Sequence, residues 1–128
     1  MKRLLLVLLI AGCAGTRTRE NSLVPALRVA NDGVELDIER GIADAVDDGE
    51  LTGTAAEMLN ERVDDFMLII EEGSYVELIA AKTYWAEYRT WAERGIADRV
   101  EDGEWSRFVA ESATERLDKF GEALAEVK

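Results

Sequence analysis

The side chains of this 128-residue chain that are best suited to bind a ligand or a cation are carboxylates, gathered around two Asp-Gly-Glu turns. Asp47 and Asp48 lie at the first turn, and Glu101 and Asp102 lie at the second. Carboxylate oxygens bind hard cations such as Ca²⁺ and pair with basic groups. Acids at the C-terminal end of a helix oppose its dipole, which favours a cation nearby. These four residues are therefore a candidate site for a cation, a basic protein or an internal arginine; alternatively they are simply solvated.

The first turn superficially resembles a calcium-binding loop, but its ligand positions are wrong. With Gly49 as the sixth residue of an EF-hand, Val46 is the third and Ala55 the twelfth. An EF-hand needs an oxygen ligand at the third position and a bidentate glutamate at the twelfth. The second turn has Val100 and Val109 at these positions. We therefore predict no EF-hand and assign no metal ligand.

Whole classes of catalytic site are excluded by composition. The chain has no histidine and a single cysteine, Cys13. Zinc sites built on His or Cys, Ser-His and Cys-His nucleophile pairs, and intrachain disulfides are therefore excluded. No acid–base or nucleophile constellation is evident, so we predict no catalytic residue, no cofactor and no enzymatic activity. The formal net charge of −12 repels nucleic acid and favours basic partners, so we expect no nucleic-acid partner.

The N-terminus has the pattern of an export signal. Lys2 and Arg3 form a basic start, and residues 4–10 form an unbroken apolar run. The run is too short to cross a bilayer as a helix, which takes roughly 20 residues. It fits the apolar region of a secretory signal peptide. The alternative is a buried or amphipathic N-terminal helix with an incidental cysteine.

The residues Ile10-Ala11-Gly12-Cys13 resemble the lipobox of bacterial lipoproteins. This resemblance implies that the Cys13 thiol is lipidated and that a peptidase cleaves between Gly12 and Cys13. Twelve residues before the cysteine make a short signal for that family. Ala14 follows the cysteine, where an aspartate would favour the inner membrane; the resemblance thus implies the periplasmic face of a Gram-negative outer membrane. Two or three acyl chains would anchor the protein stably.

Beyond the cysteine, the chain divides into a short tether and one domain. Residues 1–12 are the predicted signal peptide, and residues 13–22 are the lipidated cysteine with a polar, flexible tether. Residues 23–128 form an acidic helical domain. An internal repeat dominates this domain, because residues 39–66 align without gaps on residues 93–120, an offset of 54 with 16 identities in 28 positions. The two repeats span about residues 27–72 and 75–127.

Each repeat has the pattern of a helical hairpin. Apolar residues recur at helical spacing on both sides of each turn. Gly49 and Gly103 are suited to end the first helix of each repeat, while Thr52 and Ser106 can cap the second. Ser74 and Glu77 form a capping box. Four helices with short loops predict an all-α fold, an up-down four-helix bundle made of two duplicated hairpins. The third helix is predicted to be the longest, over about residues 75–102.

Four arginines and four glutamates recur in both repeats and predict two equivalent ion-pair networks between helices. They are Arg40, Arg62, Arg94 and Arg116 with Glu57, Glu61, Glu111 and Glu115. The alternative is that these residues form ordinary solvated helix faces.

Aromatic residues on the third predicted helix form a candidate partner surface. Tyr84, Tyr88 and Trp91 follow one another at spacings of four and three, so they share a helix face. Tyr and Trp are enriched at binding surfaces. Alternatively they fill the rim of a wider core, or form the seam of a homodimer.

Taken together, the sequence predicts a membrane-anchored lipoprotein that acts as a non-catalytic protein-binding or structural module of the cell envelope. The protein partner is not specified by the sequence. One alternative is a phage-encoded lipoprotein that masks a receptor or assists lysis. Another is a binder of a small ligand or a divalent cation within the bundle.

Overall fold

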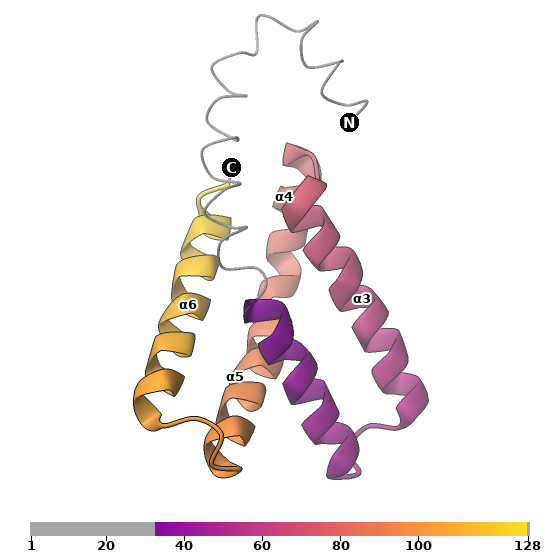
Figure 1. Ribbon diagram of the computed structural model, residues 1–128. Coiled ribbons are helices and arrows are strands. Elements are labelled where there is room, and N and C mark those ends of the chain that lie inside the picture. The colour runs from indigo at the N-terminus through magenta and orange to yellow at the C-terminus, as the bar shows by residue number, and fades with distance from the viewer. Residues whose placement is uncertain (1–32, 128) are drawn as a thin grey trace, which may run out of the picture.

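The computed structural model describes residues 33–127, and over these residues every secondary-structure element is a helix (Figure 1). A first helical segment covers residues 33–47. It is followed by α3 (Gly53–Glu72), α4 (Tyr75–Ala81), the 3₁₀ turn η2 (Lys82–Tyr84), α5 (Trp85–Glu101) and α6 (Arg107–Ala125). Among the helices of this described part, none is both long and apolar enough to cross a membrane. The predicted all-α class and its helical bundle are confirmed.

The predicted helix ends are confirmed. Gly49 and Gly103 both adopt φ +78°, in the left-handed region that glycine occupies without steric cost. The Thr52 hydroxyl accepts a hydrogen bond from Ala55 N at 3.1 Å, and the Ser106 hydroxyl accepts one from Val109 N at 3.3 Å. Each satisfies a backbone donor that the first helical turn leaves unpaired.

The predicted capping box of Ser74 and Glu77 is present in the turn between α3 and α4. There Ser74 N donates to Glu77 Oε1 at 2.9 Å, and Glu77 N donates to Ser74 Oγ at 3.2 Å. This reciprocal pair is the predicted capping box.

The prediction that the third helix is the longest, over residues 75–102, is wrong, because η2 separates α4 from α5 and leaves α3 longer than either. The Thr83 hydroxyl donates to the Ala80 carbonyl at 2.9 Å, a local bond that competes with regular helix geometry. The Lys82 Nζ donates to the carbonyls of Val127 at 2.7 Å and Ala125 at 3.2 Å. The 3₁₀ turn η2 therefore lies where Lys82 binds carbonyl groups at the C-terminal end of α6.

The buried apolar side chains form one core to which every long helix contributes. At its centre the Phe66 ring contacts the Tyr88 ring edge-on, with centroids 4.9 Å apart, and the Trp85 ring lies 4.7 Å from the Phe120 ring. The predicted apolar stripes supply most of the core. Its fully or almost fully buried members include Val34, Ile38, Ile42, Leu59, Val63, Phe66, Ile70, Leu78, Ala92, Ile96, Leu117, Phe120 and Leu124.

The helices 33–47 and α5 cross at two glycines that the repeat places in equivalent positions. A Cβ added to Gly41 would overlap the Trp91 carbonyl and lie 3.1 Å from Gly95 N. A Cβ added to Gly95 would overlap the Asp37 carbonyl and lie 2.9 Å from Gly41 N. Since real Cβ atoms do not approach backbone so closely, only glycine fits at this crossing.

Figure 1 shows what this arrangement brings together. The turn after residue 47 and the turn between α5 and α6 both lie at the lower end of the molecule. The α3–α4 turn and the C-terminal end of α6 lie at the upper end. The two acidic Asp-Gly-Glu turns, 54 residues apart in sequence, are therefore at the same end.

Candidate functional site

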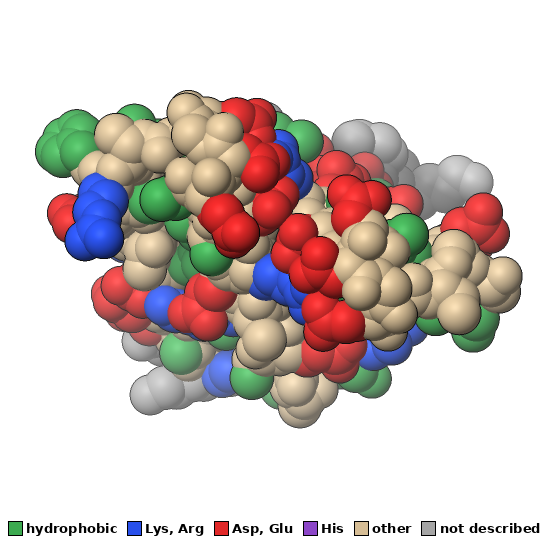
Figure 2. Space-filling model, turned by 90° about the horizontal axis from the view of Figure 1, so that it is seen from below, with side chains coloured by type: hydrophobic (Ala, Val, Ile, Leu, Met, Phe, Trp, Pro, Cys, Tyr) green, Lys and Arg blue, Asp and Glu red, His purple; other side chains and the backbone are tan. Residues whose placement is uncertain are grey.

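The lower end of the molecule carries a dense group of ion pairs around the two acidic turns. Figure 2 looks onto this end, where acidic side chains spread across the surface with basic side chains set between them. Two arginines from the crossing helices supply the positive charge. Each arginine, with the acids it contacts, forms one cluster.

The Arg40 cluster joins the helix 33–47 to the turn of the other repeat. Arg40 Nε donates to Asp98 at 2.7 Å, and its Nη2 donates to Asp102 at 2.8 Å and to Glu104. Asp98 lies on α5, and the other two acids belong to the turn that follows. One guanidinium thus binds three carboxylates, each through a charge-assisted hydrogen bond.

The Arg94 cluster repeats this arrangement in the opposite direction. Arg94 Nε donates to Asp44 at 2.9 Å, and its Nη2 donates to Asp48 at 3.0 Å and to Glu50. All four residues are offset by 54 from their counterparts in the Arg40 cluster. Each repeat therefore supplies the arginine that binds the acids of the other repeat.

In the two clusters, the contacts with arginine lower the pKa of three acids, Glu50, Glu104 and Asp98. The hydrogen bond from Arg94 lowers the pKa of Glu50, and that from Arg40 lowers the pKa of Glu104, in each case below about 4.5. The hydrogen bond from Arg40 likewise lowers the pKa of Asp98. The charged forms of these carboxyls are therefore the ones that the fold stabilises.

We expect the stability of the protein to fall in acid because these clusters titrate. A carboxyl with a lowered folded-state pKa contributes stability above its ordinary pKa and loses it as the pH falls through the folded value. The urea midpoint should therefore decrease below about pH 4.5. In the double variant Arg40→Ala, Arg94→Ala the midpoint should be lower at neutral pH and should decrease less in acid. An unchanged acid slope in that variant would contradict the assignment.

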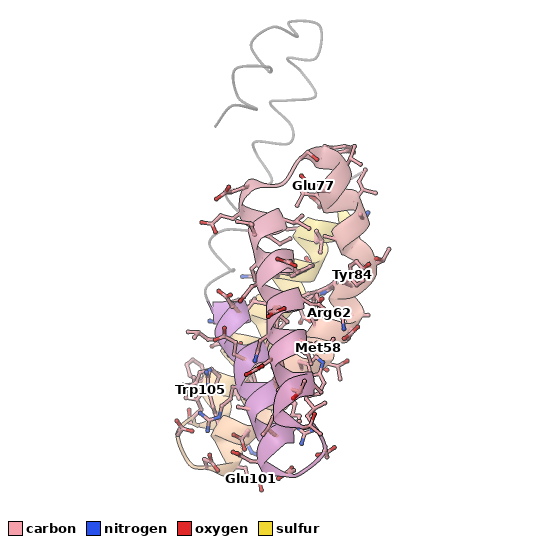
Figure 3. The ribbon with its side chains drawn as sticks, turned by 90° about the vertical axis from the view of Figure 1, so that its right-hand side faces the viewer. Met58, Arg62, Glu77, Tyr84, Glu101 and Trp105 are labelled. Carbon is pink, nitrogen blue, oxygen red and sulfur yellow. The ribbon has the colours of Figure 1, made fainter. Side chains whose placement is uncertain are left out.

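The four acids predicted as a cation or basic-partner site fall into two kinds. Asp48 and Asp102 accept hydrogen bonds from arginines, so the cation beside them is an internal guanidinium. Asp47 and Glu101 are exposed at the same end. Figure 3 shows Glu101 at the lower end of the molecule.

The prediction of two equivalent ion-pair networks is right for two of the arginines and wrong for the acids that they bind. Arg40 and Arg94 form equivalent networks between the repeats, but each binds one helix aspartate and two turn acids in place of the four predicted glutamates. The other two arginines have unlike partners: Arg62 pairs with Glu87 at 3.4 Å, and Arg116 pairs with Asp37 at 3.1 Å.

A buried ion pair that joins the two repeats and has no symmetric counterpart was not predicted from the sequence. Asp37 is fully buried and accepts hydrogen bonds from Arg99 at 2.8 Å and Arg116 at 3.1 Å. The Arg99 guanidinium lies 4.4 Å from the Trp105 ring, a cation–π contact. Burial raises the pKa of the Asp37 carboxyl, and the two arginines oppose that rise. The signal was present in the sequence, because Asp37 lies three residues after Val34 on a stripe that is otherwise apolar.

A second difference between the repeats concerns three acids on the helix 33–47 and α3. In the second repeat, Arg89 donates to Glu93 at 3.1 Å and to Asp118 at 2.7 Å. The equivalent residues of the first repeat are Glu35, Glu39 and Asp64, whose carboxylates lie within 4.8 Å of one another. Burial and the charge of Asp64 raise the pKa of Glu39.

We expect Glu39→Gln to stabilise the protein slightly at neutral pH. Because its pKa is raised in the folded state, the ionised Glu39 reduces stability as the pH rises through that value. Removing the charge should raise the urea midpoint at pH 7, and the gain should shrink at about pH 4. The matched control Glu93→Gln removes the acid that pairs with Arg89 and should not raise the midpoint. A lower midpoint for Glu39→Gln would show that this carboxylate is stabilised by a cation.

The three predicted surface aromatics have different environments. Tyr84 is 49% exposed, whereas Tyr88 is 2% exposed and packs against Phe66 in the core. Trp91 is partly buried against the core, and its carbonyl lies at the Gly41 crossing. Figure 3 shows Tyr84 on the opposite side of the molecule from Trp105. These residues do not form one exposed aromatic face.

The predicted lipidation and cleavage residues, Cys13 and Gly12, lie outside the described residues. Within residues 33–127, the polar side chains at the lower end are largely engaged in ion pairs that hold helices together. This arrangement suits a rigid body with a negatively charged end. No family model, curated protein or solved structure matches this chain.

Proposed function

We propose that this protein is a membrane-anchored lipoprotein and serves the cell envelope as a non-catalytic protein-binding or structural module. The observation that carries the proposal is the N-terminal sequence from Met1 to Cys13. It combines a basic start, a short apolar run and two small residues directly before the sole cysteine. Lipidation of Cys13 would hold the helical domain at the periplasmic face of the outer membrane through the tether.

The finer architecture that we propose is an up-down four-helix bundle of two duplicated hairpins. The 16 identities at an offset of 54 support the duplication. The two arginine clusters support it further, because each pairs an arginine from one repeat with the turn acids of the other. A repeat that contains both the arginine and its acceptors is complementary to a second copy of itself. Duplication would then join two such copies in one chain.

A role in protein binding is supported by the apolar side chains on the surface. Phe108, Val76 and Met58 are each well over half exposed. The exposed apolar residues lie on a strongly acidic body, whose repulsion keeps it soluble and disfavours indiscriminate association. Interfaces typically combine such apolar groups with a polar rim.

Fractionation of cells that express the full chain tests the anchor. We expect the wild-type protein in the membrane fraction, resistant to washing with high salt and released only by detergent, because acyl chains insert in the bilayer. The Cys13→Ser variant should lose this behaviour. Ala14→Ser, which changes the neighbouring residue and leaves the thiol, is the matched control and should stay with the membrane. Equal distribution of wild type and Cys13→Ser would refute the proposal.

A further inference from the structure

We infer that the N-terminal half of α6 is the surface that binds the protein partner, and that the partner offers a basic segment with apolar side chains. This inference deepens the proposed function and rests on it. It follows from three features: an exposed apolar pair, an adjacent hollow and the sign of the surrounding charge.

The apolar pair is Phe108 and Val109, in the first turn of α6. Phe108 is 77% exposed, more than any other large apolar residue among those described, and Val109 is 40% exposed. Their counterparts in the first repeat are Thr54 and Ala55. The fold therefore does not require large apolar side chains at these two positions, because the first repeat forms the same capped helix start without them. Phe108 therefore offers an apolar contact that the fold itself does not use.

A hollow of about 350 Å³ lies beside Phe108 on α6. Phe108 precedes Glu111 by three residues and Glu115 by seven, so these side chains occupy one face of the helix. Phe108 therefore lies beside the wall of the hollow, whereas Val109 is on another side of α6. Among the described residues, the hollow is lined by Arg107, Ala110, Glu111, Thr114, Glu115 and Asp118.

The small side chains in the hollow leave room for an incoming side chain. The Thr114 hydroxyl donates to the Ala110 carbonyl at 3.0 Å, so it is already used within the helix. The remaining polar groups are mostly carboxylates, of which Asp118 pairs with Arg89 and Glu115 with Lys119. An exposed carboxylate, Glu111, stands between the hollow and Phe108.

The charge around this surface determines the kind of partner. The turn directly before α6 carries Glu101, Asp102 and Glu104, and the last two share the single positive charge of Arg40 with Asp98. The Arg40 cluster therefore keeps a formal charge of −2, and Glu101 adds another negative charge. Basic side chains would find carboxylates in this turn and at Glu111, whereas Arg107 is the one basic residue among those described that lines the hollow.

A second copy of this chain is the less favourable occupant. The chain carries a formal charge of −12, and the lower end carries much of it, so two copies meeting at this surface would repel one another. A basic segment gains attraction from the same charge. Its apolar side chains would cover Phe108 and Val109.

Peptide binding to the full-length, detergent-extracted protein tests the inference. The probe is a fluorescent helical peptide with lysines on one face and leucines on the other, titrated by anisotropy. We expect Phe108→Ser to weaken binding about tenfold or more, since the peptide's leucines lose a large apolar contact. The matched control is Val76→Ser on α4, which removes an equally exposed apolar side chain (74%) remote from the hollow and should leave binding unchanged.

A second variant tests the contribution of charge. Glu101→Gln with Glu111→Gln should weaken binding and reduce its dependence on salt, because fewer ion pairs form. The inference is overturned if Phe108→Ser and Val76→Ser have equal effects. It is also overturned if an all-lysine peptide binds as tightly as the amphipathic one, or if Phe108→Ser only dissociates a dimer of the protein. Because both variants remove exposed side chains, matching thermal melts will show that the fold is intact.

The two proposals fail in different experiments. If the chain is membrane-bound but Phe108→Ser leaves peptide binding unchanged, the anchor proposal stands and the binding surface on α6 is refuted. If the chain binds the peptide through Phe108 but is not found in the membrane fraction, the binding surface stands and the anchor proposal is refuted.

Discussion

Replacing Gly41 or Gly95 with alanine is expected to destabilise the protein by about 2–3 kcal/mol, as overpacking in a core typically does. The added methyl group at either position overlaps a backbone carbonyl of the opposing helix. A backbone group cannot move away by changing rotamer, so the helix 33–47 and α5 must separate. Urea unfolding followed by circular dichroism measures the loss as a lower midpoint with an unchanged slope.

The matched control is Gly53→Ala at the start of α3. A Cβ at Gly53 meets nothing within 4 Å, so the substitution should be neutral or slightly stabilising. Equal midpoints for Gly41→Ala and Gly53→Ala would show that the helices do not cross at the two glycines. Separation of the helices would also lengthen the contacts in both arginine clusters, so the urea midpoint of the Gly41→Ala variant should decrease less in acid than that of its control.

Replacing Arg99 with methionine is expected to lower the free energy of unfolding by about 3 kcal/mol at neutral pH. This is the usual cost of breaking a buried ion pair by removing one partner. This change leaves the fully buried Asp37 with Arg116 as its one remaining arginine. It also removes the cation from the Trp105 ring. Urea unfolding at pH 7 and in mild acid provides the measurement.

The pH dependence of this loss has a defined sign. Burial raises the pKa of Asp37, and removal of Arg99 raises it further, so the carboxyl is more readily protonated in the folded state. A raised folded-state pKa contributes stability at low pH that is lost as the pH rises. The destabilisation by Arg99→Met should therefore shrink as the pH falls.

The double variant Arg99→Met, Asp37→Leu is the control for this prediction. It removes the buried charge together with its partner and should recover much of the lost stability, because Arg116 is partly exposed and can be hydrated. Additive losses from the two substitutions would contradict the role of Asp37 as a buried acceptor.

Local features of the fold could be predicted from the sequence because each rests on neighbouring residues. Gly49, Thr52, Ser74 and Ser106 end or begin helices through their own backbone freedom or hydroxyl groups, as predicted. The apolar stripes were predicted on the same basis, from helical spacing alone.

Features that depend on contacts between distant segments could not be predicted in the same way. The recurrence of Arg40 and Arg94 indicated ion pairs, but their acceptors are set by how the two crossing helices lie. The glycines at that crossing were visible as part of the repeat, yet their role depends on a backbone contact across 54 residues. Helical spacing also predicted that Tyr84 and Tyr88 share one face, although Tyr88 is buried in the core and Tyr84 is exposed.

The candidate binding surface was only partly visible in the sequence. Aromatic residues were sought on the third predicted helix because they cluster there, whereas the most exposed apolar side chain is the isolated Phe108 on α6. A single exposed residue gives no periodic signal, and its exposure depends on which side of α6 packs against the core. Comparison of the repeats offers the one available clue, because Phe108 replaces the polar Thr54.

The most direct test of the account is the intact mass of the full chain extracted from membranes, measured beside the Cys13→Ser variant. We predict a mature chain that begins at Cys13 and carries acyl mass, with neither cleavage nor acylation in the variant. A chain that still begins at Met1 and carries no lipid would contradict the lipoprotein proposal and, with it, the location at the outer membrane.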